Sequence, residues 1–174
     1  MKKNISLWQL GGFAFTAVGG TLLHFLYEWS GEQWWVAPIS GVNESTWEHM
    51  KLLFVPLLAF ALLQRRFWRE ENFWCVKLAG ILTGLMLIPL LFYTYNGAIG
   101  KSPDWLNITL FFVAAAGAFF VETRLFRAHS RCRLPRPAFW LICVIGVLFV
   151  VFTFFPPHLP LFRDPLTGGY GLSG

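Results

Sequence analysis

Long apolar stretches run through this chain and limit what it can fold into. The composition is 56% hydrophobic and only 13% charged, with nineteen Phe and nine Trp residues. A soluble protein of 174 residues could not bury so much apolar surface in its interior. Lipid must therefore surround much of the chain, and we expect an integral membrane protein.

Five of these stretches suit transmembrane helices, which need roughly 17–25 residues to cross hydrocarbon. The expected spans are residues 7–27, 45–63, 73–93, 105–121 and 138–155. The uninterrupted apolar part of the second span is too short to cross alone, so its helix must carry Glu48, His49 and Lys51 to the membrane boundary. The predicted fold class is an all-α integral membrane protein, a bundle of five transmembrane helices forming one domain over residues 1–174.

Basic residues occupy alternate loops, and this pattern orients a membrane protein. In the loops on the other side, the only basic residues are Lys101 and Arg163, and Lys51 lies at the start of the second span. Because cytoplasmic loops are enriched in Lys and Arg, we expect the N-terminus inside and the C-terminus outside. The same clustering argues against a nucleic-acid partner despite the net charge of +5, and the expected partner is the lipid bilayer. The residues on the basic side are Lys2, Lys3, Arg65, Arg66, Arg69, Arg124, Arg127, Arg131, Arg133 and Arg136.

Small and aromatic residues are expected to have structural roles. Gly12, Thr16 and Gly20 lie four apart in the first span, a spacing that lets helix backbones approach closely in lipid. Tryptophan favours the membrane–water interface. We therefore expect an outer aromatic belt of Trp34, Trp35, Trp47 and Trp105 and an inner one of Trp68 and Trp74.

Other single residues carry weaker expectations. Cys75, Cys132 and Cys143 are an odd number without paired spacing, so neither a disulfide framework nor a zinc finger is predicted. The last three spans contain few polar residues, and no polar path for transport is visible.

Glu122, at the inner end of the fourth span, is expected to pair with a neighbouring arginine. The first apolar run lacks a small-residue cleavage site, so we expect an uncleaved span.

Ionisable residues gather at the expected outer boundary, and this cluster is the candidate site. Ser45 and Glu48 have the spacing of a capping box, in which the hydroxyl accepts from a first-turn amide and the carboxylate reaches back. One helix start needs only one cap. Glu44, His49 and Lys51 therefore remain without a structural explanation.

Two other segments contribute to the same boundary. His24 and Glu28 lie four apart and share a face of the first span. Ionisable groups at this depth usually face protein or water rather than lipid. In the tail, residues 156–174, prolines flank His158 and keep the backbone extended, and Asp164 follows. Because the tail also contains Leu, Phe and Tyr, we expect it to fold over the outer face.

His24, His49 and His158 are suitable ligands for zinc or another divalent metal. In a metal-dependent hydrolase, Glu44 or Glu48 would act as the base for a metal-bound water. There is no HExxH or other compact metal motif, so the ligands would come from three separate segments. The remaining residues of this candidate site are Glu28, Lys51 and Asp164.

The segments VNESTWEHMKLLF (42–54) and FPPHLPLFRDPLTGGYG (155–171) resemble those of a family of small bacterial integral membrane proteins of unknown function. The resemblance extends along nearly the whole chain, including LLHF at 22–25 and FYTYNG at 92–97. It implies a location in the bacterial cell (inner) membrane. It assigns no residue a catalytic role, because the family has no established activity.

Three functions stay open at this point. The first is a metal-dependent hydrolase acting on a lipid or an envelope-derived substrate at the outer leaflet. The second is a subunit that binds or transports a small molecule or an ion, and the third is a non-catalytic membrane scaffold. The sequence also leaves the oligomeric state open.

Overall fold

The computed structural model describes residues 4–100, 103–129 and 131–173. Lys2, Lys3 and Lys101, which contribute to the orientation argument, lie outside the described residues. Within the described residues, all five α-helices are long and apolar enough to cross a membrane, which confirms that this part of the chain is all-helical with five candidate spans. The elements are α1 (Ile5–Trp29), α2 (Thr46–Phe67), α3 (Phe73–Ile99), α4 (Asp104–Arg127), α5 (Pro135–Phe154) and the 3₁₀ helices η1 (Pro160–Phe162) and η2 (Gly171–Ser173).

Helices α3 and α4 extend beyond the apolar stretches that predict them. α3 continues to Ile99 and α4 to Arg127, whereas the expected spans end at residues 93 and 121. In the added turns of α3, Asn96 Nδ2 donates to the backbone oxygen of Phe92 at 2.8 Å, so the polar side chain does not interrupt the helix. Hydropathy marks the part of a helix that lipid can surround, but hydrogen bonding decides where the helix ends.

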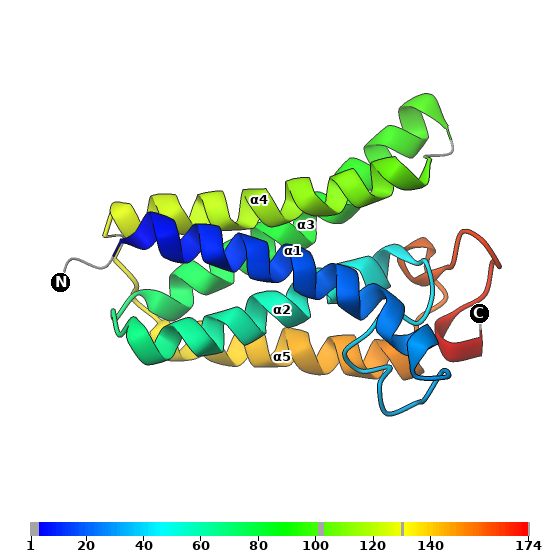
Figure 1. Cartoon of the computed structure of the whole chain (residues 1–174), viewed down its shortest axis with the longest axis horizontal. Coiled ribbons are helices and arrows are strands. Elements are labelled where there is room, and N and C mark those ends of the chain that lie inside the picture. The colour runs from blue at the N-terminus through cyan, green and yellow to red at the C-terminus, as the bar shows by residue number, and fades with distance from the viewer. Residues whose placement is uncertain (1–3, 101–102, 130, 174) are drawn as a thin grey trace.

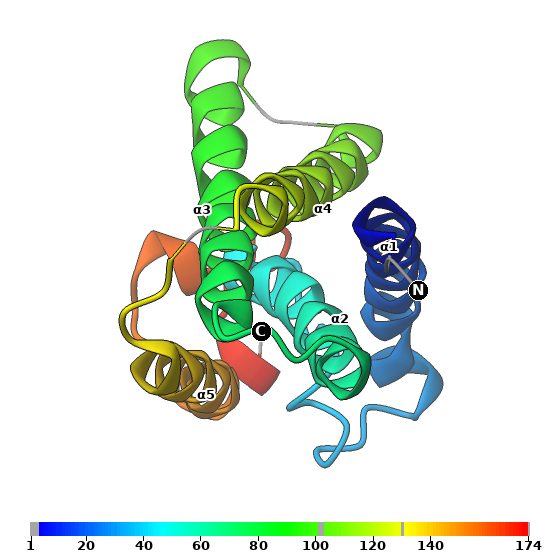
Figure 2. The ribbon, with the colours of Figure 1, turned by 90° about the vertical axis from the view of Figure 1, so that its left-hand side faces the viewer.

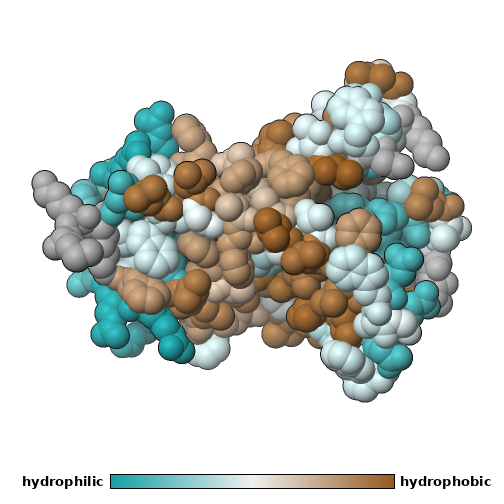
Figure 3. All heavy atoms as spheres, viewed as in Figure 1, coloured by the Kyte–Doolittle hydropathy of each residue, from teal (hydrophilic) through white to brown (hydrophobic). Residues whose placement is uncertain are grey.

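Helix α2 lies at the centre of the bundle and is its most buried helix (Figure 2). α1, α3 and α5 pack around it, and α4 packs against α3 and α1 (Figure 1). The start of α1 and the tail after α5 lie at opposite ends of the bundle (Figure 1). Figure 3 shows hydrophobic residues across the middle of the molecule, between hydrophilic residues at its two ends. We call these ends the basic end, where α2 and α4 finish and α5 begins, and the tail end.

Small residues on α1 let the helices approach closely. A Cβ added at Gly12 would lie 2.5 Å from ring atoms of Phe60 on α2 and of Phe119 on α4. A Cβ at Gly20 would overlap the ring of Phe111 on α4. The stripe of small residues is therefore used for packing inside the bundle.

Trp47 and Trp68 are buried, so the expectation that they belong to the interfacial belts is wrong. The ring centroid of Trp47 lies 4.5 Å from that of Phe149 on α5 and 4.8 Å from that of Phe162 in η1. This aromatic cluster packs the tail against the start of α2 and the end of α5. The tail thus contains two short 3₁₀ helices rather than being extended throughout. Exposed tryptophans of the kind expected at an interface are Trp34, Trp35 and Trp105.

A buried polar network joins three helices near the basic end. The expected arginine partner of Glu122 is wrong, because Lys77 Nζ on α3 lies 2.5 Å from Glu122 Oε2. Gln9 Nε2 on α1 donates to the same oxygen at 3.0 Å. All three side chains are buried, and an ionised pair in such a position depends on its partner and its hydrogen bonds. Four rings lie 5.5 to 6.0 Å from Lys77 Nζ, those of Phe60, Phe73, Phe119 and Phe126.

Cys75 at the start of α3 and Cys132 in the α4–α5 loop form a disulfide, whereas the sequence predicts no disulfide framework. Their Cα atoms lie 6.0 Å apart, within the usual range for a disulfide. The residues are 57 positions apart in sequence, so their spacing carries no signal. Cys143 on α5 is free.

Candidate functional site

A capped helix start positions most of the candidate residues. Ser45 Oγ accepts from the backbone N of Glu48 at 3.4 Å, and Asn43 Oδ1 accepts from the backbone N of Ser45 at 2.9 Å. The Glu48 carboxylate does not complete the expected capping box, because it accepts from the backbone N of Val42 at 3.1 Å instead. Asn43 Nδ2 donates to the backbone oxygen of Gly171 at 3.0 Å, so the same turn also holds the tail.

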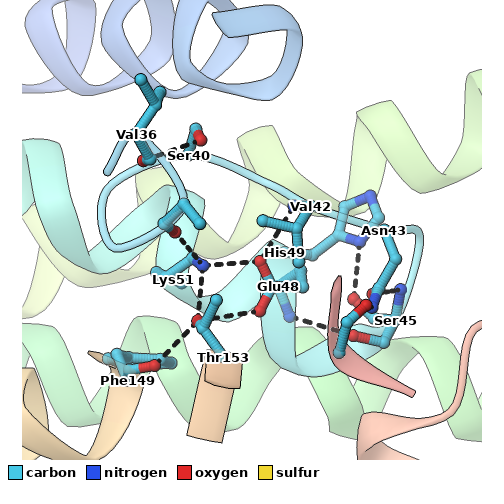
Figure 4. Close-up of polar contacts among 12 residues, drawn as sticks. Val36, Ser40, Val42, Asn43, Ser45, Glu48, His49, Lys51, Phe149 and Thr153 are labelled. Atoms are coloured by element: carbon cyan, nitrogen blue, oxygen red, sulfur yellow. Dashed lines mark hydrogen bonds and ion pairs between the residues drawn. The ribbon is translucent and has the colours of Figure 1, made fainter. Parts of the chain in front are cut away.

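Behind this turn lies a buried ion pair that we call the tail-end network (Figure 4). Lys51 Nζ lies 2.6 Å from Glu48 Oε2 and donates to Thr153 Oγ1 on α5 at 2.7 Å. It also donates to the backbone oxygen of Ala37 at 2.8 Å. The three protons of the ammonium group therefore each have an acceptor. The network connects the α1–α2 loop, the start of α2 and the end of α5.

Lys51 and Glu48 have structural roles in this arrangement. Their side chains are 0% and 3% exposed. The Glu48 carboxylate, one of two expected bases, is held by Lys51, by Val42 and by the Thr153 hydroxyl at 3.2 Å. It does not line the cavity at this end of the molecule. The tail-end network fixes the first turn of α2, which carries His49, and the loop before it, which carries Glu44.

His24, Glu44 and His49 form a separate, half-exposed cluster. His24 Nε2 lies 3.6 Å from Glu44 Oε1, and His49 Nε2 lies 3.5 Å from Glu44 Oε2. The two imidazole centroids are 5.7 Å apart. One carboxylate therefore faces two imidazoles, one through each of its oxygens. Glu28, which shares a face of α1 with His24, is exposed, and the carboxylate that lies next to His24 is that of Glu44.

The orientation of the His49 ring determines which nitrogen can react. Its Nδ1 lies 3.0 Å from the backbone oxygen of Ser45. A carbonyl oxygen can only accept, so Nδ1 carries a proton and donates it. Nε2 then faces Glu44, either as an acceptor in the neutral ring or as a second donor in the charged ring.

These three side chains line a cavity of about 550 Å³ at the tail end. It lies between α1, α2, α3, α4 and the tail, with Asn96 of α3 and Asn107 of α4 also in its wall. Small-molecule sites have roughly 300–1,000 Å³ and are mostly apolar, with a few polar groups that fix orientation. The rest of this wall fits that description, with Phe25, Leu52, Ile88, Phe92, Ile108, Leu110, Phe111, Phe112 and Leu166.

The structure places His158 and Asp164 outside this cluster. His158 is exposed, and its ring packs edge-on against Tyr170 with centroids 4.7 Å apart. Asp164 is buried in a turn of the tail, where it accepts from the backbone N of Leu166 at 2.8 Å and from the Thr167 hydroxyl at 3.0 Å. Both residues serve the fold of the tail.

The expected metal site receives no support from this geometry. Within residues 4–100, 103–129 and 131–173, no group of three or more His, Cys, Asp or Glu could hold a metal ion. His24 and His49 face different oxygens of Glu44, so the three groups do not converge on one point. His158, the third expected ligand, contacts Tyr170.

Sequence reasoning missed Thr153 and Lys77, which complete the two buried networks. Lys77 had a usable signal, because a lysine inside an apolar span needs a buried partner. Thr153 had none, since a hydroxyl near the end of an apolar helix commonly bonds to its own backbone. Here its single hydroxyl proton lies between two acceptors, Phe149 O at 2.9 Å and Glu48 Oε1 at 3.2 Å.

Comparison with known proteins leaves the activity open. Neither the curated proteins nor the solved structures show a match to this chain. The Family of unknown function (DUF6512) matches residues 1–172, nearly the whole chain. The arrangement of five helices, the tail-end network and the His24–Glu44–His49 cluster thus belong to a member of this family: the chain is a DUF6512 protein.

Proposed function

We propose that this protein binds an amphipathic molecule, derived from lipid or from the cell envelope, in the cavity at its tail end. The observation that carries the proposal is a cavity with one polar edge, formed by His24, Glu44 and His49, and a wall that is otherwise mainly apolar. A polar group of the ligand would lie against that edge, and its apolar part would lie along α3 and α4.

The polar edge suits a ligand group that donates hydrogen bonds. Glu44 is an acceptor when ionised, and Nε2 of either imidazole can accept or donate according to its protonation. A hydroxyl or ammonium group could therefore insert at Glu44, where the contacts to His24 and His49 are long for hydrogen bonds. Burying the apolar part adds about 25 cal/mol for each Å² removed from water.

The cavity can be entered from the side of the bundle. Phe25 and Ile108, which line it, are 41% and 60% exposed. The ends of α3 and α4 diverge from α1 and α2 in this region (Figure 1). A molecule already dissolved in the bilayer would reach the polar edge without crossing bulk water.

The geometry favours binding over metal-dependent hydrolysis and over transport. Metal-dependent hydrolysis would need the ligand set that the structure separates. Transport would need a polar path through the bundle, whereas the polar groups that line this cavity lie at the tail end. A ligand in the cavity needs only the groups that already line it.

The proposal is tested by titrating a fluorescent single-chain lysophospholipid into the detergent-purified protein. Glu44→Gln should weaken binding about tenfold or more, because a hydrogen bond to a charged group is lost. Glu28→Gln is the matched control, since it removes an equal charge from an exposed position on α1 that does not line the cavity. Equal affinities for the two variants would contradict the assignment of the polar edge. Ile108→Gln should also weaken binding, and an unchanged affinity there would contradict the apolar wall.

We further infer that the basic end faces the cytoplasm of a bacterial cell, so that the cavity faces outwards. The support is the excess of arginine at the ends of α2 and α4 and at the start of α5. The Cys75–Cys132 disulfide at this same end argues in the opposite direction, because disulfides are rare in the cytosol. Alkaline phosphatase fused after residue 174 should be active in cells if the orientation is right, and green fluorescent protein at the same position should not fluoresce. The reverse result would invert the topology.

A further inference from the structure

A second cavity, of about 470 Å³, lies at the basic end of the molecule. It is formed where α2 ends, α3 begins and α5 begins. Two arginines line it, Arg65 on α2 and Arg136 on α5, together with Trp74, Phe139 and Trp140. None of these residues belongs to the tail-end cavity. The combination of cationic groups with an aromatic wall at a membrane boundary indicates a site for a lipid headgroup.

Arg65 is held in place by the protein. Its Nη1 donates to the backbone oxygens of Trp68 at 3.1 Å and Glu70 at 3.4 Å. Its guanidinium carbon lies 5.4 Å from the ring centroid of Phe73. Guanidinium has five N–H donors, and Nη1 supplies only two of them, so donors remain for a ligand. A guanidinium fixed in this way suits bidentate contact with a phosphate group.

Arg136 adds a second positive charge at a favourable position. It lies in the first turn of α5, whose N-terminus has no side-chain cap hydrogen bond. The positive end of the helix dipole therefore adds to the charge of the arginine side chain. Among the first three residues of α5 only Arg136 has a backbone N–H, because Pro135 and Pro137 have none. Arg65 and Arg136 together make this cavity favourable for an anion.

The aromatic wall distinguishes a lipid from a free anion. The ring centroids of Trp74 and Phe139 lie 4.7 Å apart, and Phe139 and Trp140 follow at 5.7 Å. A free phosphate gains nothing from such a wall, whereas the glycerol backbone and the first carbons of acyl chains bury apolar surface against it. Cys132 also lines the cavity, and its disulfide to Cys75 holds the α4–α5 loop at the rim.

Glu71 lines the same cavity and refines the class of ligand. A carboxylate would repel a bare phosphate. It would accept hydrogen bonds from a headgroup that carries hydroxyl groups next to its phosphodiester. We propose that this cavity binds a glycerophospholipid such as phosphatidylglycerol, with its phosphate at Arg65 and Arg136, its headgroup hydroxyls at Glu71 and its glycerol backbone against Trp74 and Trp140.

The test is native mass spectrometry of the detergent-purified protein with added phosphatidylglycerol. Arg136→Gln should lower the fraction of protein that retains this lipid about tenfold, because a charge-assisted contact to phosphate is removed. Arg133→Gln is the matched control, since it removes an equal charge from an exposed position in the same segment, outside the cavity. Equal losses in the two variants would overturn the proposal, because retention would then depend only on general positive charge.

Two further measurements separate the possible sources of the phosphate. Phosphatidylcholine, whose headgroup lacks hydrogen-bond donors, should be retained less than phosphatidylglycerol, and equal retention would overturn the role of Glu71. Inorganic phosphate should raise the thermal unfolding temperature less than phosphatidylglycerol does. An equal rise would overturn the lipid assignment and leave a site for free phosphate. Both substituted arginines are exposed, so the variants should fold, and circular dichroism checks this.

Discussion

Replacing Lys51 with methionine would test whether the tail-end network holds this end of the bundle together. Methionine has a similar length without the ammonium group, so the change removes the positive charge and its hydrogen bonds and keeps most of the side-chain packing. It deletes the contacts of Nζ to Glu48 at 2.6 Å, to Thr153 at 2.7 Å and to Ala37 at 2.8 Å. The Glu48 carboxylate would then stay buried without its opposite charge.

The magnitude follows from that uncompensated charge. Removing one partner of a buried ion pair costs about 3–5 kcal/mol. For a chain of this size, each kcal/mol lowers the unfolding temperature by roughly 2–4 °C. We therefore expect Lys51→Met to unfold about 6–20 °C below the parent protein. Arg66→Met, at an exposed position on the same helix, should change stability by no more than about 0.5 kcal/mol.

The assay is thermal unfolding of the detergent-purified protein followed by tryptophan fluorescence, since Trp47 lies one turn from Lys51. Adding Glu48→Gln to Lys51→Met should recover part of the lost stability, because the neutral side-chain amide of glutamine needs no opposite charge. The reasoning is refuted if Lys51→Met unfolds within the range of the Arg66→Met control. It is also refuted if the double variant is less stable than Lys51→Met alone.

Four further predictions follow from the same structure. Lys77→Met should destabilise the protein by a similar amount of about 3–5 kcal/mol, measured in the same unfolding assay. Gly20→Leu should lower the yield of folded protein in size-exclusion chromatography, because its side chain would overlap Phe111. His158→Ala should leave lysophospholipid affinity unchanged, since its ring contacts Tyr170 outside the cavity. A chelator should not shift the unfolding temperature, and elemental analysis that finds a bound divalent metal would contradict this expectation.

Much of the architecture could be predicted because it depends on local sequence. The length of an apolar stretch decides whether a helix can cross hydrocarbon, and all five helices satisfy that criterion. The spacing of Gly12 and Gly20 likewise predicted close helix packing, because small side chains leave room wherever a neighbour lies. Ser45 was predicted to cap α2, since a cap involves only residues in the same turn.

The partners of the ionisable residues could not be predicted in the same way. His24 has a glutamate four residues away on its own helix, yet it faces Glu44 from the following loop. Glu122 has arginines nearby in sequence, yet it pairs with Lys77 on α3. Local spacing offers a possible partner, but burial decides which pairing forms, because a charge inside the bundle is stable only with a partner that is also inside.

The sequence by itself determined that this chain has five lipid-compatible helices and that ionisable groups gather near the ends of the first two. Both properties can be read from the residue types along the chain, because each residue type has its own free energy of transfer from water to lipid. Only the tertiary structure decided that Lys51 and Glu48 support the fold while His24, Glu44 and His49 line a cavity. The physical reason is that Thr153 and Ala37, which are distant in sequence, supply the acceptors that let Lys51 be buried. His49 in the same helix turn, Glu44 in the preceding loop and His24 on α1 instead face the cavity.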